Sequence, residues 1–211
     1  MRAVGSRARL GGLAARLAGG AIGILILAGW PALASAGGGI SLAFFSGGHG
    51  AHASWEQTVT PGGGLAGIEL SNPLPTGATY SGATVNGVKG LAMSQVRELS
   101  FMIDTNGYMS GGAPRFSVIL SDGVVLFPSA GDCFNLPISP HTGWQTAEFV
   151  SGTNPCAIYG STAGPTGGAA SWQAWTTFLG DPTIVALYIV QDEGPATAYI
   201  ARVSVNDTVA R

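Results

Sequence analysis

Short segments in which apolar and polar residues alternate constrain the fold of this chain most. Leu99, Phe101 and Ile103 fall on one side of an extended chain, and the other side has Glu98, Ser100, Met102 and Asp104. Residues 114–121 repeat the pattern. Because successive side chains of a strand point to opposite faces, both segments predict strands with one buried face.

Further short apolar segments follow one another with Gly, Pro or Asn between them, as in a protein built from many strands. Asp122-Gly123 is a two-residue hairpin signal. The continuously apolar segment 184–190 predicts a central strand that is buried on both faces. The other candidate strands are residues 40–45, 55–60, 65–70, 78–85, 124–127, 144–150 and 199–205.

One segment has helical spacing instead. Trp172, Trp175 and Phe178 form an apolar stripe that Ser171 can cap and Gly180 can end. Many short strands with a single short helix predict an all-β fold, a β-sandwich of jelly-roll type. Without an internal repeat or a linker, we expect one domain over residues 37–211.

The first 36 residues have the features of a secretion signal. Arginines precede an apolar stretch over residues 21–30, Pro31 follows, and Ala34-Ser35-Ala36 is a small-x-small cleavage pattern. An uncleaved membrane anchor over residues 17–36 is the alternative, since that stretch is uncharged and long enough to span a bilayer. The pattern favours cleavage, so we expect a secreted, extracellular or cell-envelope protein that no membrane segment retains.

The charge of the expected mature chain excludes several partners. Five basic residues remain against eleven acidic ones, a net charge of −6. Nucleic acids and anionic lipids require clustered positive charge, so we expect neither as a partner. Charged residues make up 9% of the chain, against about 25% in an average protein.

The two cysteines, Cys133 and Cys156, both lie in the part expected to be exported. In an oxidising compartment a pair with no competitor forms a disulfide, and we predict that bond here. Two thiolates without neighbouring ligands do not complete a metal site.

The segments around residues 111–118 and 191–206 resemble parts of bacterial secreted jelly-roll domains of the galactose-binding-like, carbohydrate-binding-module type. The resemblance covers the second half of the mature chain and implies a carbohydrate-binding β-sandwich. Such domains often end in Tyr-Ile-Asp-Asn-Val, where the Asp can support calcium. Here Ala201-Arg202 follow Tyr199-Ile200, so the calcium ligand does not carry over.

Catalytic and metal motifs are weak. His49, His52 and His141 suggest a metal set, but a polar loop is the simpler interpretation. The G-x-S-x-G motif of serine hydrolases is absent. A glycosidase needs two carboxylates across the scissile bond, and no pair stands out by its spacing. The candidates are Glu56, Glu69, Glu98, Asp104 and Glu148. We therefore expect no cofactor and no metal, and a binding protein rather than an enzyme.

Rings beside turns are the remaining candidates for function, because sugars stack on exposed aromatic faces. Trp144, Tyr108 and Tyr159 have such positions, and Arg115 and Asp104 supply polar groups. We expect a secreted, non-catalytic domain that binds carbohydrate or a cell-surface component. A polysaccharide hydrolase, and a structural or adhesive envelope protein without a small ligand, are the alternatives.

Overall fold

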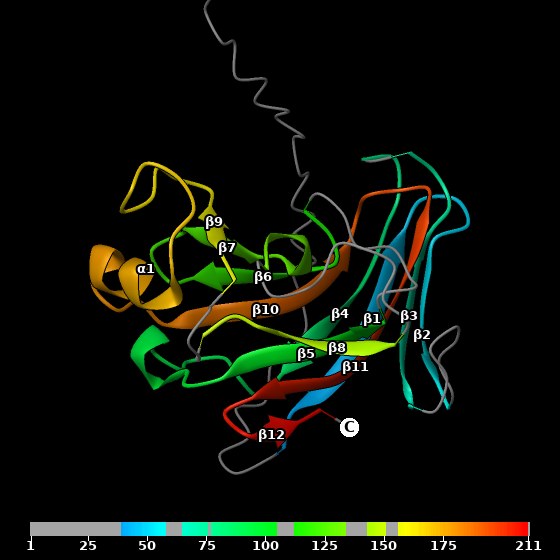
Figure 1. Ribbon diagram of the computed structural model, residues 1–211, viewed down its shortest axis with the longest axis horizontal. Helices are drawn as coiled ribbons and strands as arrows, with labels where there is room; N and C mark the ends of the chain where they lie inside the picture. Colours follow the sequence, from blue (N-terminus) through cyan, green and yellow to red (C-terminus); the bar gives the residue numbers. More distant parts are fainter. Residues whose placement is uncertain are drawn as a thin grey trace, which may run out of the picture.

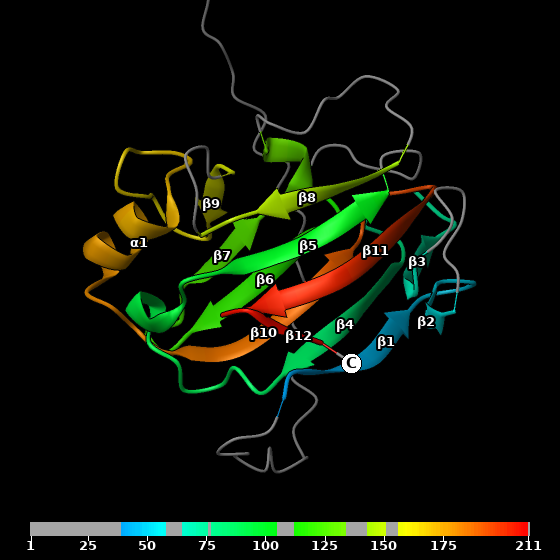
Figure 2. The same ribbon diagram turned by 60° about the horizontal axis from the view of Figure 1, so that its bottom comes forward.

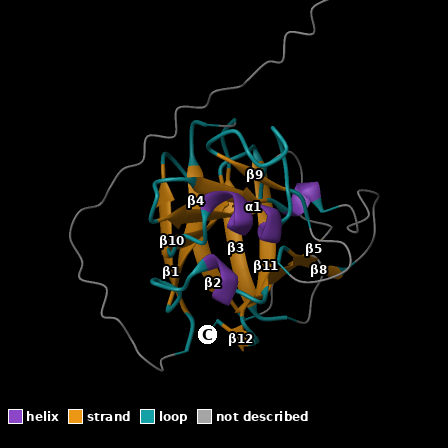
Figure 3. Ribbon diagram, turned by 90° about the vertical axis from the view of Figure 1, so that its left-hand side faces the viewer, coloured by secondary structure: helices purple, strands orange, loops and turns teal. Residues whose placement is uncertain are grey.

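The computed structural model describes residues 39–57, 65–75, 77–104, 112–133, 143–150 and 156–210. In this part of the chain two antiparallel β-sheets pack as two layers (Figure 1), which the end view separates clearly (Figure 3). The predicted β-sandwich is confirmed. The expected signal over residues 1–36 lies outside the described residues.

Sheet A has the strand order β1-β4-β10-β6-β7-β9, and every neighbouring pair is antiparallel. Its members in chain order are β1 (Ser41–Gly47), β4 (Tyr80–Asn86), β6 (Arg115–Leu120), β7 (Val125–Pro128), β9 (Ile158–Gly160) and β10 (Ile184–Gln191).

Sheet B has the order β2-β3-β11-β5-β8, and β12 extends it by pairing with β11. Figure 2 turns this sheet toward the viewer. Its members are β2 (His52–Glu56), β3 (Gly67–Asn72), β5 (Leu99–Asp104), β8 (Trp144–Glu148), β11 (Ala196–Val205) and β12 (Thr208–Val209).

The chain passes repeatedly from one layer to the other, as between β3 and β4, β5 and β6, or β10 and β11. Apart from β2–β3, β6–β7 and β11–β12, neighbouring strands in a sheet are therefore not consecutive in sequence. This connectivity is compatible with a jelly roll, and the jelly-roll assignment stays a prediction.

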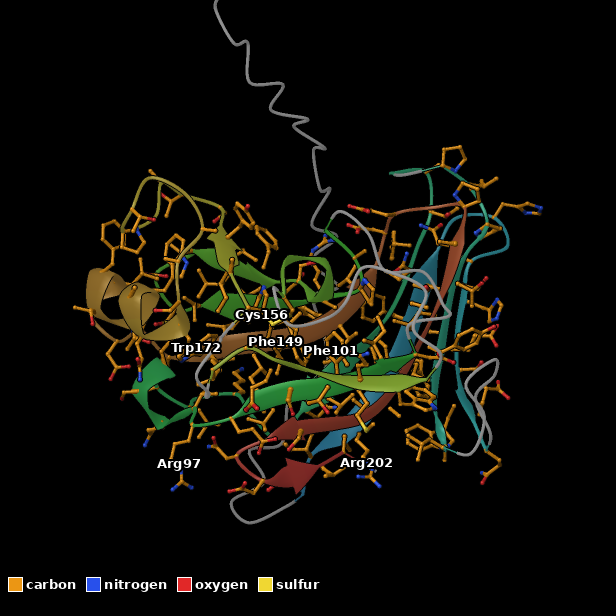
Figure 4. All side chains as sticks on the ribbon, viewed as in Figure 1. Arg97, Phe101, Phe149, Cys156, Trp172 and Arg202 are labelled. Carbon is orange, nitrogen blue, oxygen red and sulfur yellow. A yellow bond between two sulfur atoms is a disulfide. The ribbon has the colours of Figure 1, made fainter. Side chains whose placement is uncertain are left out.

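The core lies between the two sheets, where the alternation predicted it. Phe101 of β5 and Phe116 of β6 are fully buried and meet Phe149, with ring centroids 5.2–5.4 Å apart. Figure 4 shows Phe101 and Phe149 between the layers, with Arg97 and Arg202 pointing away from them. In the described part, no helix has the length and apolar character needed to cross a membrane.

The predicted helix forms as α1 (Trp172–Leu179) at one end of the sandwich (Figure 3). The Ser171 side chain accepts a hydrogen bond from the Ala174 backbone N–H, and Gly180 ends the helix at φ 74°. Trp172 and Trp175 are buried, and each donates its indole N–H to a carbonyl, of Met93 and Ile158 respectively. Two 3-10 turns, η1 (Met93–Gln95) and η2 (Ala130–Asp132), complete the described elements.

One expectation for segment 184–190 is wrong. It forms β10, which lies inside sheet A as predicted, but only one of its faces is buried. Leu187 and Ile189 point into the core, whereas Val185 is 43% exposed and Tyr188 is half-buried. The apolar residues on the outer side have no third layer above them among the described elements, so core packing does not explain them.

The predicted disulfide between Cys133 and Cys156 is present. Cys133 follows η2, close to the end of β7 in sheet A. Cys156 donates its backbone N–H to the carbonyl of Glu148, the last residue of β8 in sheet B. The bond therefore joins the residue after η2 to Cys156, two residues before β9 of sheet A, and the hydrogen bond to Glu148 connects this position to sheet B.

Candidate functional site

Five aromatic side chains gather on the outer side of sheet A, and we call this surface the ring face. Their side chains point to solvent because the residues before and after them in each strand point into the core. The alternation that fills the core therefore also places these rings on the outer surface. Tyr159 is 48% exposed and Tyr80 is 42% exposed, and the other three rings are half-buried. The ring face consists of Phe45, Tyr80, Phe127, Tyr159 and Tyr188.

Three of these rings lie along one line across the sheet. Tyr188 of β10 is paired with Ser117 of β6. Val118 is paired with Leu126, so the next pair along β6 and β7 is Ser117 and Phe127. Phe127 is in turn paired with Tyr159 of β9. Since neighbouring strands are about 4.8 Å apart, the line from Tyr188 to Tyr159 spans about 14 Å.

The other two rings lie beside Tyr188. The Phe45 ring lies 5.9 Å from Tyr188 in an edge-to-face arrangement and 6.2 Å from Tyr80. A Cβ atom at Gly82 would collide with the Phe45 ring and with the carbonyl oxygen of Ile189. The glycine therefore lets Phe45 lie close against the sheet.

Sheet A has one charged residue in its six strands, Arg115. The residue is 8% exposed, and its guanidinium forms two parallel hydrogen bonds of 2.5 Å with the Asp192 carboxylate. It also donates to the carbonyl of Gly112 and lies 5.6 Å from the ring centre of Phe127. The ion pair thus neutralises the only charged residue in the strands of sheet A. The same guanidinium makes a cation–π contact with Phe127, one ring of the ring face.

The outer side of sheet B has a different chemistry. The strands of sheet B contain four acidic residues and one basic residue, Arg202. We call this surface the acidic face. Its carboxylates are Glu56, Glu69, Asp104 and Glu148.

Two of these carboxylates are on either side of Tyr199. Glu69 is paired with Tyr199, and the neighbouring pair Ile200–Ile103 places Asp104 across from Tyr199 on the other side. Burial raises the pKa of Tyr199, and the negative charges of Glu69 and Asp104 raise it further. Glu69 also accepts a 3.0 Å hydrogen bond from the exposed His52 ring.

The predicted ligand residues do not come together in one place. Arg115 and Tyr159 belong to sheet A, on either side of Phe127. Asp104 and Trp144 form a cross-strand pair in sheet B, where Asp104 is fully buried and Trp144 is half-buried. Tyr108 lies outside the described residues.

The sequence patterns do not identify the remaining rings of the ring face as site residues. They place Tyr188 in a strand expected to be buried on both faces, and Phe127 in a short apolar strand. The sequence does contain a signal, because β10 has apolar residues on both sides of the strand. A two-layer sandwich buries only one side of each strand, so burial in the core does not account for the apolar residues on the outer side.

A separate hollow lies between η1 and α1. It has a volume of about 570 Å³, with Trp172 and Val150 among its apolar residues and Ser94, Gln173 and Arg97 among its polar ones. Trp172 is 2% exposed and its indole N–H is already donated, so the hollow offers no free ring for stacking.

Within the described ranges, no three His, Cys, Asp or Glu side chains are grouped closely enough to hold a metal ion. His49 and His52 lie in and beside the β1–β2 turn, and His141 is outside the described residues.

Comparison with known proteins returns no match, either to a family model, to a curated protein or to a solved structure.

Proposed function

We propose that this protein is a secreted, non-catalytic domain that binds an uncharged, extended carbohydrate on its ring face. The observation that carries the proposal is the line of rings from Tyr188 through Phe127 to Tyr159 across the outer side of sheet A.

Stacking is the contact that such a line favours. The flat apolar side of a sugar ring packs on an aromatic face, and a tyrosine adds a hydroxyl that can bond the sugar's own hydroxyls. Rings on successive strands offer stacking positions at intervals of one or two strand spacings, which suits a ligand with repeating units.

The charge distribution supports an uncharged ligand. The strands under the ring face have no acidic residue, and their one cation, Arg115, is already paired with Asp192. An anionic ligand would find no free cation on these strands, and a cationic one would find no free carboxylate.

The hydrolase alternative is supported by one observation, the position of Glu69 and Asp104 on either side of Tyr199. Their strands are separated by two spacings, about 10 Å, near the range of inverting glycosidases. However, Asp104 is fully buried, and a catalytic carboxylate must reach its substrate. For this reason we favour binding without catalysis.

Binding to a glycan array and to insoluble cellulose, chitin and xylan tests the proposal. We expect the mature protein to bind at least one of these, and the double variant Tyr159→Ala/Tyr80→Ala to bind it about fivefold or more weakly. Each lost ring removes a contact worth about 0.5–1.5 kcal/mol. Both residues are more than 40% exposed, so the variant should fold normally.

Trp144→Ala on the acidic face is the matched control, and its binding should equal that of the unmodified protein. If the unmodified protein bound neither the glycan array nor any of the insoluble polysaccharides, the carbohydrate proposal would be excluded. Loss of binding in Trp144→Ala, with retention in the double variant, would move the site to the acidic face. Secretion is tested separately, by mass spectrometry of exported protein, which should begin at Gly37.

A further inference from the structure

The interior of the sandwich changes from apolar to polar at one end. Along the inward side of β3, Ile68 and Leu70 are followed by Asn72. Along the inward side of β10, Leu187 and Ile189 are followed by Gln191. At the start of β4 the same change places Thr79 and Ser81 before Ala83 and Val85, and all four polar side chains are at most 2% exposed.

These four side chains come from both layers and lie at the same end of the sandwich. Ser81 and Gln191 are a cross-strand pair in sheet A, and Thr79 precedes Ser81 by two residues. Asn72 belongs to sheet B, and its amide carbon would lie 3.2 Å from a Cβ atom at Gly194. Gly194 follows Gln191 by three residues, and the Gln191 amide donates to the carbonyl of Glu193 at 2.6 Å.

Five polar atoms in this cluster have no hydrogen-bond partner among the described residues. They are Nδ2 and Oδ1 of Asn72, Oγ1 of Thr79, Oγ of Ser81 and Oε1 of Gln191. No other buried side-chain nitrogen or oxygen in the described part of the chain lacks a partner. A buried polar group without a partner costs free energy, so a concentration of such groups in one place indicates a bound polar species.

The atoms indicate which species fits. A metal ion would suit the four oxygens but would be repelled by the Asn72 NH₂ group, which remains a donor whichever way the amide is turned. It would also add a buried charge among neutral ligands. The nearest carboxylates in sequence, Asp192 and Glu193, are engaged with Arg115 and with the Gly112 N–H. Water both donates and accepts, and is stable with two to four polar partners.

We propose that this end of the sandwich is a buried water site, in which Asn72, Thr79, Ser81 and Gln191 bind at least one ordered water molecule between the two sheets. The water bridges sheet A and sheet B where apolar packing ends. It also supports the turn after Gln191, whose Asp192 holds the buried Arg115 beside the ring face.

The test combines a high-resolution crystal structure with oxygen-17 magnetic relaxation dispersion of the whole protein in solution. We expect a water within 2.7–3.2 Å of polar atoms of at least two of the four side chains, and a matching long-lived water in solution. Direct hydrogen bonds among the side chains without water, or an ion at the position, would overturn the proposal.

Asn72→Leu keeps the branched arrangement of side-chain heavy atoms and removes both polar amide atoms, and it should lower the number of long-lived waters by at least one per molecule. Ser71→Ala is the matched control, because Ser71 is the next residue on the outer side of β3 and bonds Thr197. Its water count should not change. An unchanged count in Asn72→Leu would contradict the proposal. If that variant does not fold, the crystal structure of the unmodified protein still decides the question.

Chelation distinguishes water from a metal ion. Treatment with EDTA, or exchange of sodium for potassium, should leave the melting temperature unchanged. A fall of several degrees that calcium restores would assign the site to a cation instead.

Discussion

The two outer sides of the sandwich differ far more than the two inner sides. Both sheets contribute the same kind of apolar residues to the core. On the outside, sheet A presents rings and one neutralised cation. Sheet B also has two rings on its outer side, Tyr199 and Trp144, but they lie among carboxylates, an arginine and a histidine. The core requires nothing of these outer residues, so their divergence reflects demands other than folding. Because packing of the core does not require apolar residues on the outer side of sheet A, their presence there indicates a role for the ring face other than folding.

The largest expected effect comes from the lone charge of sheet A. Arg115→Met leaves Asp192 without its partner and removes the contact with Phe127, so we expect a loss of about 3 kcal/mol in the free energy of unfolding. Arg202→Met is the control on sheet B, where the side chain is exposed and we expect less than about 0.5 kcal/mol. Urea unfolding measures both. If Arg115→Met and Arg202→Met lowered the free energy of unfolding by similar amounts, the ion pair of Arg115 would not be more important for stability than the exposed Arg202.

The disulfide gives an effect of similar size, next to the paired strands β7 and β9 of sheet A. Reduction should lower the free energy of unfolding by about 3 kcal/mol, because an open loop leaves the unfolded chain more conformational entropy. The Cys133→Ser/Cys156→Ser variant should lose the same amount and should not respond to reductant. Two titratable thiols in the exported, non-reduced protein would contradict the prediction.

A smaller effect is expected beneath the ring face. Gly82→Ala introduces a methyl group that meets the Phe45 ring and the Ile189 carbonyl, so the strand or the ring must shift. We expect a loss of about 1–3 kcal/mol, by analogy with overpacked cores, together with weaker carbohydrate binding. Ser117→Ala, on the same side of the sheet, should change stability by less than about 0.5 kcal/mol. Equal stability of the two variants would show that Phe45 is free to move.

The smallest effect is expected from pH, at Glu98, the residue before β5 of sheet B. Partial burial of Glu98 raises its pKa, but hydrogen bonds from the Asp207 N–H and the Ser100 and Ser204 hydroxyls lower it by more, so the net shift is downward. This contribution to stability is present above the ordinary glutamate pKa, about 4.3, and is lost as pH falls through the lowered value.

Glu98→Gln should therefore reduce the fall in stability between about pH 5 and pH 3 by less than about 1 kcal/mol, because the side chain is partly exposed. Urea unfolding at several pH values measures it, with Ser117→Ala as the control from the uncharged sheet. A steeper acid loss in Glu98→Gln than in the unmodified protein would contradict the sign of the shift.

The sequence predicted the strands and the helix wherever local signals were strong. Alternation in residues 97–104 and 114–121 located β5 and β6, and the Ser171 cap and Gly180 located α1. The three residues of β9 are too few to show alternation, so that strand was missed.

The ring face could not be predicted, because it depends on pairings between distant segments. Tyr188 and Phe127 are 61 residues apart in sequence, and only the insertion of β10 between β4 and β6 brings them to the same line. Local periodicity shows which side of a strand is buried but not which strands are neighbours. The sequence therefore identifies Arg115 and Tyr159 as candidate ligand residues but not Phe127, which lies between them and contacts Arg115.

The disulfide also sets how far the chain can be extended. Cys133 and Cys156 are 23 positions apart, so the bond keeps about 80 Å of extended backbone out of reach of a force that pulls on the two ends of the chain. With the bond intact, a molecule that is pulled at its two ends extends by less before its strands are fully drawn out, because the 23-residue interval between the cysteines cannot lengthen.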